Sequence, residues 1–145
     1  MIFEQLFDTK SSTYTYIISS GEGREALIID PVIEHTNEYL KILDIGHSGN
    51  SPDRAMIILE TAVSQCSFEN KTKVIKVITG HGSGKLRNAV RDWCKDQDGR
   101  FKDVIYGEDY DMFNKAAVDM RSDCGQPNDM DFGRKNAAVT YIWLR

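Results

Sequence analysis

Residues 73–90 read KVIKVITGHGSGKLRNAV, an apolar stretch followed by a glycine-rich turn and a basic segment. The β-branched residues of the first part predict a strand that ends near Thr79. After the glycines, apolar residues recur every three or four positions and predict an amphipathic helix. These residues are Leu86, Ala89, Val90, Trp93 and Cys94. The glycine turn therefore lies at the carboxyl end of a strand, where open α/β sheets place their sites.

The neighbouring segments extend this alternation of strands and helices. Ser51-Pro52-Asp53 is typical of a helix start, and an apolar stripe continues from there to Cys66. Residues 103–106 and 137–144 predict further strands. From residue 40 onward the order is β-α-β-α-β-β, an α/β fold in which we expect parallel pairing through right-handed crossovers.

Residues 34–45 leave two interpretations open. Glu34 to Ile42 fit one short helix. The stretch KILDI, residues 41–45, equally fits a short and mostly buried strand. The glycines that follow it favour the strand.

The first forty residues predict a separate β segment. FEQLF, STYTYIIS and EALIID are rich in β-branched and aromatic residues, and SSGEGR supplies a hairpin turn between the second and the third. Asp30-Pro31 ends this part, because proline cannot donate to a strand ladder. We therefore expect an N-terminal β segment over residues 1–40 and a second domain over residues 41–145.

Residues 107–136 form a long polar stretch before the last predicted strand. At about thirty residues it is longer than most connections in a compact domain, so we expect an insertion, a lid or a mobile loop. Its centre, NKAAVDM, fits one or two helical turns. Its carboxylates lack the order of an EF-hand loop, and we expect them to be solvated. They are Glu108, Asp109, Asp111, Asp119, Asp123, Asp129 and Asp131.

The composition argues against several classes of function. The formal net charge of −4 argues against a protein that coats DNA by general electrostatics, so any anion must bind at a local basic patch. The absence of an apolar run of about 20 residues and of a signal peptide predicts a cytosolic protein without a membrane partner. The cysteines form no C-x-x-C pair, which predicts buried thiols rather than a disulfide or a zinc site.

The glycine turn matches neither of two common phosphate-binding motifs. The spacing from Gly80 to Gly84-Lys85 is one residue too short for a Walker A loop, and Gly84 follows Gly82 too closely for the dinucleotide fingerprint. Glycines still allow consecutive amides to turn inward as an anion-binding nest at a helix N-terminus, with Lys85 and Arg87 in the first turn. The alternative is a tight structural turn with basic residues in solvent.

VITGHGSGKLRNAVRDW resembles the signature of the Smr (small MutS-related) domain, in which a strand ends in T/H-G-x-G and the next helix opens with L-R/K-x-x-V. LDIGHSGNSPDRAMIIL resembles the opening strand and helix of that domain, and AAVTYIWLR resembles its last strand. The resemblance covers about residues 40–145. It implies a two-layer β-α-β-α-β-β sandwich like the C-terminal domain of translation initiation factor three. It also implies binding of RNA or DNA, often with endonuclease activity.

The same resemblance suggests which residues form the site. Asp44 takes the place of the family's acidic residue, and Thr79, Gly80 and Gly82 take the positions of the glycine turn. Where the family usually has a histidine two positions after the aspartate, this chain has glycine, and His47 follows one position later. A bulge could still bring His47 near Asp44, or the catalytic histidine is missing and the protein binds without cleaving.

Residues 1–40 are similar to the opening β-hairpins of metallo-β-lactamase-fold sulfur dioxygenases of the glyoxalase II-like group. The H-x-H-x-D-H metal motif of those enzymes does not follow, and His35 and His47 have no partners at ligand spacing. We therefore expect a structural segment without a dinuclear iron or zinc site.

Two hypotheses about function follow. In the first, a nucleic-acid-binding endonuclease holds a phosphate with the amides of Gly80 to Gly84, Ser83, Lys85 and Arg87. Asp44, His47 and His81 supply its acid–base groups, and ligand spacing supports no metal or other cofactor. In the second, the chain is a non-catalytic nucleic-acid or protein interaction module, and the 107–136 insertion binds a protein partner.

Overall fold

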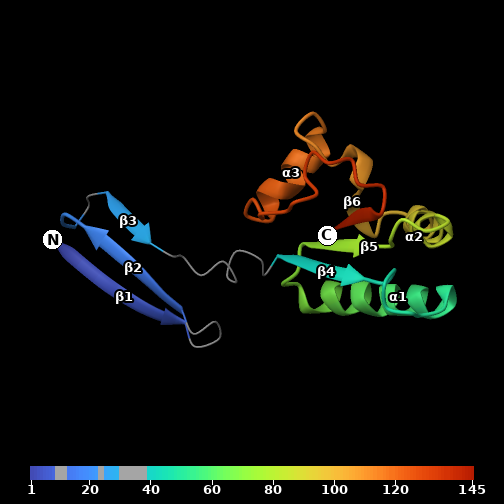
Figure 1. The fold of residues 1–145 in the computed structure, drawn as a ribbon, viewed down its shortest axis with the longest axis horizontal. Helices are drawn as coiled ribbons and strands as arrows, with labels where there is room; N and C mark the ends of the chain where they lie inside the picture. Colours follow the sequence, from blue (N-terminus) through green and yellow to red (C-terminus); the bar gives the residue numbers. More distant parts are fainter. Residues whose placement is uncertain (9–12, 23–24, 30–38) are drawn as a thin grey trace. The chain divides into compact units, whose positions relative to one another are not determined.

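The computed structural model describes residues 1–8, 13–22, 25–29 and 39–145. Contacts divide the chain into two units, Met1–Thr36 and Asn37–Arg145. Figure 1 shows the elements of each unit. The helix interpretation of residues 34–42 and the side chain of His35 fall mostly or wholly outside the described residues.

The first unit contains a three-stranded antiparallel sheet of β1 (Ile2–Asp8), β2 (Thr13–Ser19) and β3 (Ala26–Ile29), with β2 in the middle. This confirms the β prediction for the described residues among the first thirty. The rings of Phe3 and Tyr16 stack across β1 and β2 with their centroids 6.0 Å apart.

The second unit contains a mixed sheet in the order β4-β5-β7-β6. Its strands are β4 (Leu40–Asp44), β5 (Val74–Ile78), β6 (Phe101–Tyr106) and β7 (Val139–Leu144). β4 confirms the strand interpretation of residues 41–45, but the expectation of a mostly buried strand is wrong, because Ile42 and Asp44 are exposed and the other residues of β4 are only partly buried. The α/β fold class is confirmed as well.

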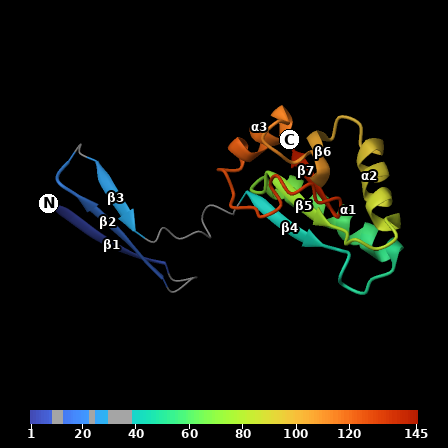
Figure 2. The same cartoon turned by 45° about the horizontal axis from the view of Figure 1, so that its top comes forward.

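The expected parallel pairing holds for β4 and β5 but is wrong for β5 and β6. The last strand, β7, lies between β5 and β6 and runs antiparallel to both (Figure 2). β7 is buried along nearly its whole length. A central position suits such an apolar strand, because both of its edges are paired and both of its faces are covered.

One helix precedes β5 in sequence, and another follows the glycine turn. α1 (Pro52–Glu69) begins as predicted: the Ser51 hydroxyl accepts a hydrogen bond from the amide of Arg54, and proline occupies the first turn. α2 (Lys85–Asp96) begins directly after Gly84.

These helices cover one face of the sheet. The core between them and the sheet contains Ile45, Ala55, Leu59, Val63, Cys66, Ile75, Val77, Val90, Cys94, Phe101, Ile142 and Leu144. The cysteines of both helices are buried in it, as the sequence predicted.

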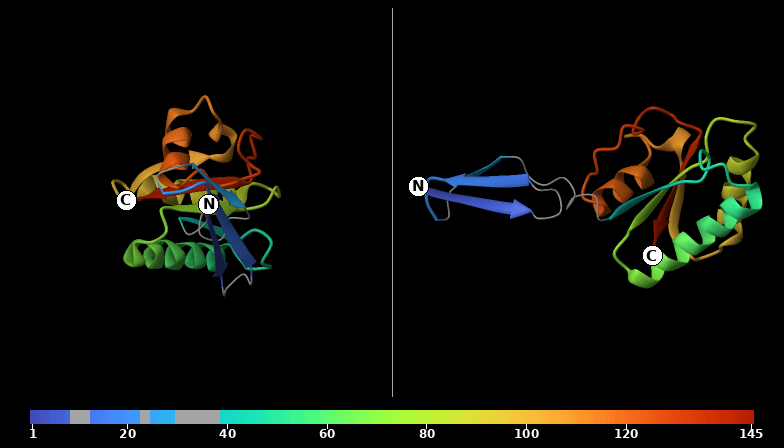
Figure 3. Two further views of the ribbon diagram at one scale, coloured as in Figure 1. Left: turned by 90° about the vertical axis from the view of Figure 1, so that its left-hand side faces the viewer. Right: turned by 60° about the horizontal axis from the view of Figure 1, so that its bottom comes forward.

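The insertion covers the opposite face. It contains a short 3-10 helix, η2 (Gly107–Asp109), and α3 (Lys115–Asp123), which confirms the predicted helical turns. A second apolar core joins it to the sheet, made of Val74, Ile105, Tyr110, Ala117, Met120, Cys124, Val139 and Tyr141. Figure 3 shows α1 and α3 on opposite sides of the sheet. The insertion is therefore a packed layer of the domain.

Ion pairs fasten this layer to the sheet. Lys76 in β5, whose side chain is 8% exposed, lies 2.7 Å from Asp129, whose side chain is 3% exposed, and 2.5 Å from Asp131. The hydroxyl of Tyr141 donates to Asp129 at 2.6 Å. Burial lowers the pKa of Lys76, but hydrogen bonds to both carboxylates outweigh burial, so its pKa is raised.

A second set of ion pairs lies at the end of α3. Asp123 accepts hydrogen bonds from Trp143, Lys73 and Lys102. These bonds, with that of Trp143 the strongest influence, lower the pKa of Asp123 to about 2. The expectation of solvated carboxylates is thus wrong for Asp123, Asp129 and Asp131, because lysine side chains and, for Asp123, the indole of Trp143 bind them.

Candidate nucleic-acid interface

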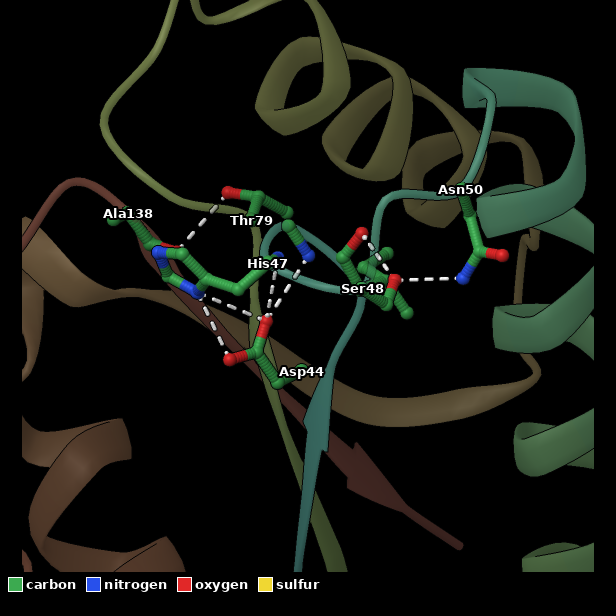
Figure 4. A network of polar contacts seen from close by, with 8 residues as sticks. Asp44, His47, Ser48, Asn50, Thr79 and Ala138 are labelled. Atoms are coloured by element: carbon green, nitrogen blue, oxygen red, sulfur yellow. Dashed lines mark hydrogen bonds and ion pairs between the residues drawn. The ribbon is translucent and has the colours of Figure 1, made fainter.

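The segments that follow β4 and β5 meet the segment that precedes β7 at one edge of the sheet (Figure 4). The amide and the hydroxyl of Thr79, directly after β5, both donate to the carbonyl oxygen of Ala138, at 2.8 and 3.0 Å. The Thr79 hydroxyl is therefore engaged inside the protein.

A bulge ends the pairing of β4 with β5. The consecutive amides of Ile45 and Gly46 both donate to the carbonyl oxygen of Ile78, at 3.0 and 3.1 Å. Two residues of one strand thus oppose one residue of its neighbour, which is the pattern of a β-bulge. Ile45 is buried at 2% exposure, and the chain then turns so that the side chain of His47 returns to Asp44.

Asp44 and His47 form a hydrogen-bonded pair. Nδ1 of His47 lies 2.9 Å from Oδ2 of Asp44, and Oδ1 accepts from the amides of Gly46 and His47 at 3.1 Å each. Partial burial raises the pKa of Asp44, but these hydrogen bonds from His47 and Gly46 outweigh it and lower the pKa below its usual value.

The ionised carboxylate decides which nitrogen of His47 carries the proton. An ionised aspartate only accepts hydrogen bonds, so Nδ1 must donate to it. In the neutral ring Nε2 is then the acceptor. Nε2 has no hydrogen-bond partner in the described part of the chain, and it lies 3.7 Å from the position that a Cβ at Gly80 would take.

Gly46 occupies the place where the sequence comparison expects a histidine. A Cβ at this position would lie 2.4 Å from the carbonyl carbon of Thr79 and 2.8 Å from the amide nitrogen of Gly80. No side chain fits there, because both neighbours are backbone atoms. The sequence did not reveal this role of Gly46, since the close approach depends on the β4–β5 pairing.

The glycine turn lines a pocket of about 170 Å³. Its lining contains every residue of the predicted phosphate site: Thr79, Gly80, Gly82, Ser83, Gly84, Lys85 and Arg87, with Gly46 and Leu86. Gly80 and Gly84 adopt φ values of +75° and +81°, a left-handed conformation that favours glycine. Within the described residues, no protein acceptor binds the amides of residues 80–84.

Among the described residues the cations of this pocket have no acidic partner within ion-pair distance, although the charge of Arg87 adds to the contact of Arg91 in lowering the pKa of Glu108. Among the residues described, neither Lys85 nor Arg87 forms an ion pair, and Nε of Arg87 is buried without a hydrogen-bond acceptor. The Arg87 guanidinium lies against Gly84, with Nη2 2.7 Å from the position of a Cβ there. His81 is exposed and does not line the pocket.

Arg91 differs from these two cations. It lies outside the apolar stripe of α2, yet its side chain is only 12% exposed. It donates two hydrogen bonds to Glu108, at 2.9 and 2.7 Å, and one to the carbonyl of Ala137. The pKa of Glu108 is lowered chiefly by this contact. Arg91 therefore joins α2 to the insertion.

The described residues include no group of three His, Cys, Asp or Glu side chains arranged to hold a metal ion. Nor does any described helix combine the length and the apolar character needed to span a membrane.

Comparison with known proteins identifies the central part of the chain. Residues 48–109 match the family model of the Smr domain. Among solved structures, the Smr domain of Thermus thermophilus MutS2 aligns with a TM-score of 0.48 and 18% identity, over 72% of this chain and 98% of that one.

Curated relatives match a shorter part of the chain. The mitochondrial persulfide dioxygenase ETHE1 of Mus musculus is 50% identical over 43 residues, which are 30% of this chain and 17% of that protein. The same enzyme of Bos taurus is 50% identical over 34 residues, 23% of this chain and 13% of that protein. The chain thus spans less than a fifth of either relative.

The Smr match supports a general kind of function. The Smr domain is known as a nuclease and nucleic-acid-binding module.

Proposed function

We propose that the second unit binds RNA or DNA at the edge formed by the glycine turn and cleaves a phosphodiester bond there. One observation carries the proposal. Within the described residues, the amides of residues 80–84 have no hydrogen-bond acceptor, and the side chains of Lys85 and Arg87 form no hydrogen bond or ion pair. Nε2 of His47 lies near Gly80 in the same turn.

The glycine turn would hold a phosphate group. Its amides lie at the N-terminus of α2, where the helix dipole contributes about half a positive charge. Lys85 and Arg87 add full charges, and no acidic residue lines the pocket. Ser83 adds a hydroxyl. A charge-assisted contact of this kind contributes about 1.5–3 kcal/mol.

His47 would act as the general base. Its Nε2 accepts the proton of the attacking oxygen, from water or a 2′-hydroxyl group, as that oxygen bonds to phosphorus. The P–O bond on the opposite side breaks, and the leaving oxygen takes a proton from a second group, for which His81 is the candidate. Asp44 acts through His47, because its carboxylate keeps the proton on Nδ1 and orients the ring.

The test is cleavage and binding of labelled RNA and DNA oligonucleotides over a series of salt concentrations. We expect His47→Gln to reduce cleavage by about 10²- to 10⁴-fold and to leave affinity nearly unchanged. We expect Lys85→Ala/Arg87→Ala to weaken binding and to reduce the salt dependence. Each phosphate contact contributes about 0.7 to the slope of log K against log salt on single strands.

Two further comparisons identify the attacking group and test whether cleavage needs a metal ion. Cleavage of RNA but not of the matching DNA would assign the 2′-hydroxyl as the attacking group, and parallel reactions with and without EDTA test for a divalent metal. Lack of binding at about 50 mM salt would contradict the proposal, because low salt strengthens phosphate contacts.

Binding without cleavage would leave the non-catalytic interaction module. A protein partner at the insertion belongs to that alternative, and exposed apolar side chains favour it: Met112 is 68% exposed and Phe113 is 90% exposed. A cytosolic location also stays a prediction, to be tested by cell fractionation.

A further inference from the structure

A second pocket, of about 450 Å³, lies between β4 and the insertion. Its lining residues are Ile42, Lys76, Asn128, Asp129, Met130, Asp131 and Arg134. This volume falls within the range of small-molecule sites, which is about 300–1,000 Å³.

The pocket lies on the same face of β4 as Asp44. Side chains alternate along a strand, so Leu40, Ile42 and Asp44 share one face. Leu40 packs into the second core, which identifies that face as the one covered by the insertion. Ile42 and Asp44 are two residues apart, or about 6.6 Å along the strand. The pocket therefore lies on the Asp44 side of β4, with Ile42 two residues before Asp44.

The two pockets differ in charge. Lys76 and Arg134 balance Asp129 and Asp131, so the formal charges that line the larger pocket sum to zero. The glycine turn instead has two cations and no carboxylate. A phosphate anion therefore suits the turn, and a neutral group suits the larger pocket.

The lining also provides the contacts that a flat polar ring needs. Ile42 and Met130 are apolar and 61% and 73% exposed. Within residues 39–145 the Asn128 amide and the Arg134 guanidinium make no hydrogen bond, so both can serve a ligand. Methionine packs favourably against aromatic rings, and arginine stacks on bases and donates to their edges.

We propose that this pocket receives the base of an unpaired nucleotide whose neighbouring phosphate is held at the glycine turn. The inference rests on the proposed function and makes it more specific: the substrate must be single-stranded at the site. A base inside a duplex is stacked and paired, and it cannot enter such a pocket without leaving the helix.

The experiment compares three ligands of equal phosphate number by fluorescence anisotropy: a single-stranded oligonucleotide, the same backbone with all bases removed, and a duplex. We expect the intact chain to bind the single strand about 5- to 30-fold more tightly than the base-free backbone, because stacking of a single base contributes a factor of that order. We expect the duplex to bind more weakly than the single strand.

Matched variants locate the effect. Met130→Ala and Arg134→Gln, separately and together, should reduce the preference for bases and leave affinity for the base-free backbone nearly unchanged. Met112→Ala and Lys135→Gln are the controls, because both residues are exposed, belong to the insertion and do not line the pocket. Thermal unfolding of each variant shows that the fold is retained.

The outcomes separate this inference from the proposed function. Three results would overturn the base pocket but keep the phosphate site, provided that binding depends on salt. The protein could show no preference for bases, it could bind the duplex as tightly as the single strand, or its preference for bases could persist in Met130→Ala and Arg134→Gln. If none of the three ligands binds, the proposed function is wrong and the base pocket is wrong with it.

Discussion

Gly46 packs its Cα against the backbone of Thr79, so closely that a Cβ at position 46 would lie 2.5 Å from the Thr79 carbonyl oxygen. This contact joins the segment that carries His47 to the segment that carries the glycine turn. The two parts of the candidate site therefore hold each other in place.

A larger side chain at position 46 should reduce the stability of the second unit. We expect Gly46→Ala to destabilise the second unit by about 1–3 kcal/mol or more, since the extra methyl group must displace backbone atoms. Gly82→Ala is the matched control: Gly82 has no positive φ, and a Cβ there would meet nothing within 4 Å. Denaturant unfolding of both variants measures the difference, and equal stabilities would contradict the close approach.

The buried ion pairs of Lys76 should contribute more to the free energy of unfolding than an ion pair on the surface. Lys76→Met leaves Asp129 and Asp131 without their cation, and we expect a loss of about 3–5 kcal/mol in the free energy of unfolding. The comparison is Lys115→Met in α3, whose partner is Asp119 and whose side chain is 88% exposed. Such a pair contributes about 0–1 kcal/mol. A similar small effect for both variants would show that the insertion does not depend on Lys76.

Asp123 should make stability depend on pH in the acid range. Its pKa is about 2 in the folded chain against 3.8 for the free group. The unfolded state binds the proton more readily, so this contribution is complete above about pH 4 and is lost as the pH falls toward 2. We expect about 1–2 kcal/mol after allowing for partial exposure of the carboxylate.

The measurement is the free energy of unfolding of wild type and Asp123→Asn between pH 2 and 6, at concentrations of denaturant that keep both transitions visible. The gap between the two proteins should close as the pH falls. Asp92→Asn serves as control, because that carboxylate is 72% exposed and pairs only with Lys95 at 3.5 Å. A gap that stays constant would contradict the role assigned to Asp123.

The thiols should be unreactive in the folded protein. All of the cysteines are buried, and burial raises the pKa of Cys94 to about 12 and that of Cys124 to about 11. Only the thiolate attacks a disulfide reagent, so at pH 8 we expect reaction with DTNB only as fast as the chain unfolds. In about 6 M guanidinium chloride all three should react at once. Rapid reaction without denaturant would show that a cysteine is accessible.

The sequence predicted most of the secondary structure, because its signals are local. Ser51-Pro52 marks the start of α1, and β-branched residues mark β5 and β7. The order of the strands in the sheet could not be predicted in this way. The position of β7 between β5 and β6 depends on pairing between segments more than sixty residues apart, and no local pattern records it.

In the candidate site, too, the features that are local in sequence were predicted and those that depend on distant segments were not. The glycine turn and its two cations are contiguous in sequence and were identified there. Lys76 was not identified, because a single lysine inside an apolar strand gives no sign of a carboxylate 53 residues away. Gly46 looked like a missing histidine until the bulge after β4 showed that the backbone of Thr79 fills the space beside it.

The place of β7 has a consequence for biosynthesis. β5 and β6 leave the ribosome before the strand that joins them exists, so each has an unpaired edge until residues 139–144 emerge. Until then, β5 and β6 of the nascent chain can pair incorrectly with other exposed strands. Correct folding of this domain therefore depends on how quickly residues 139–144 are translated.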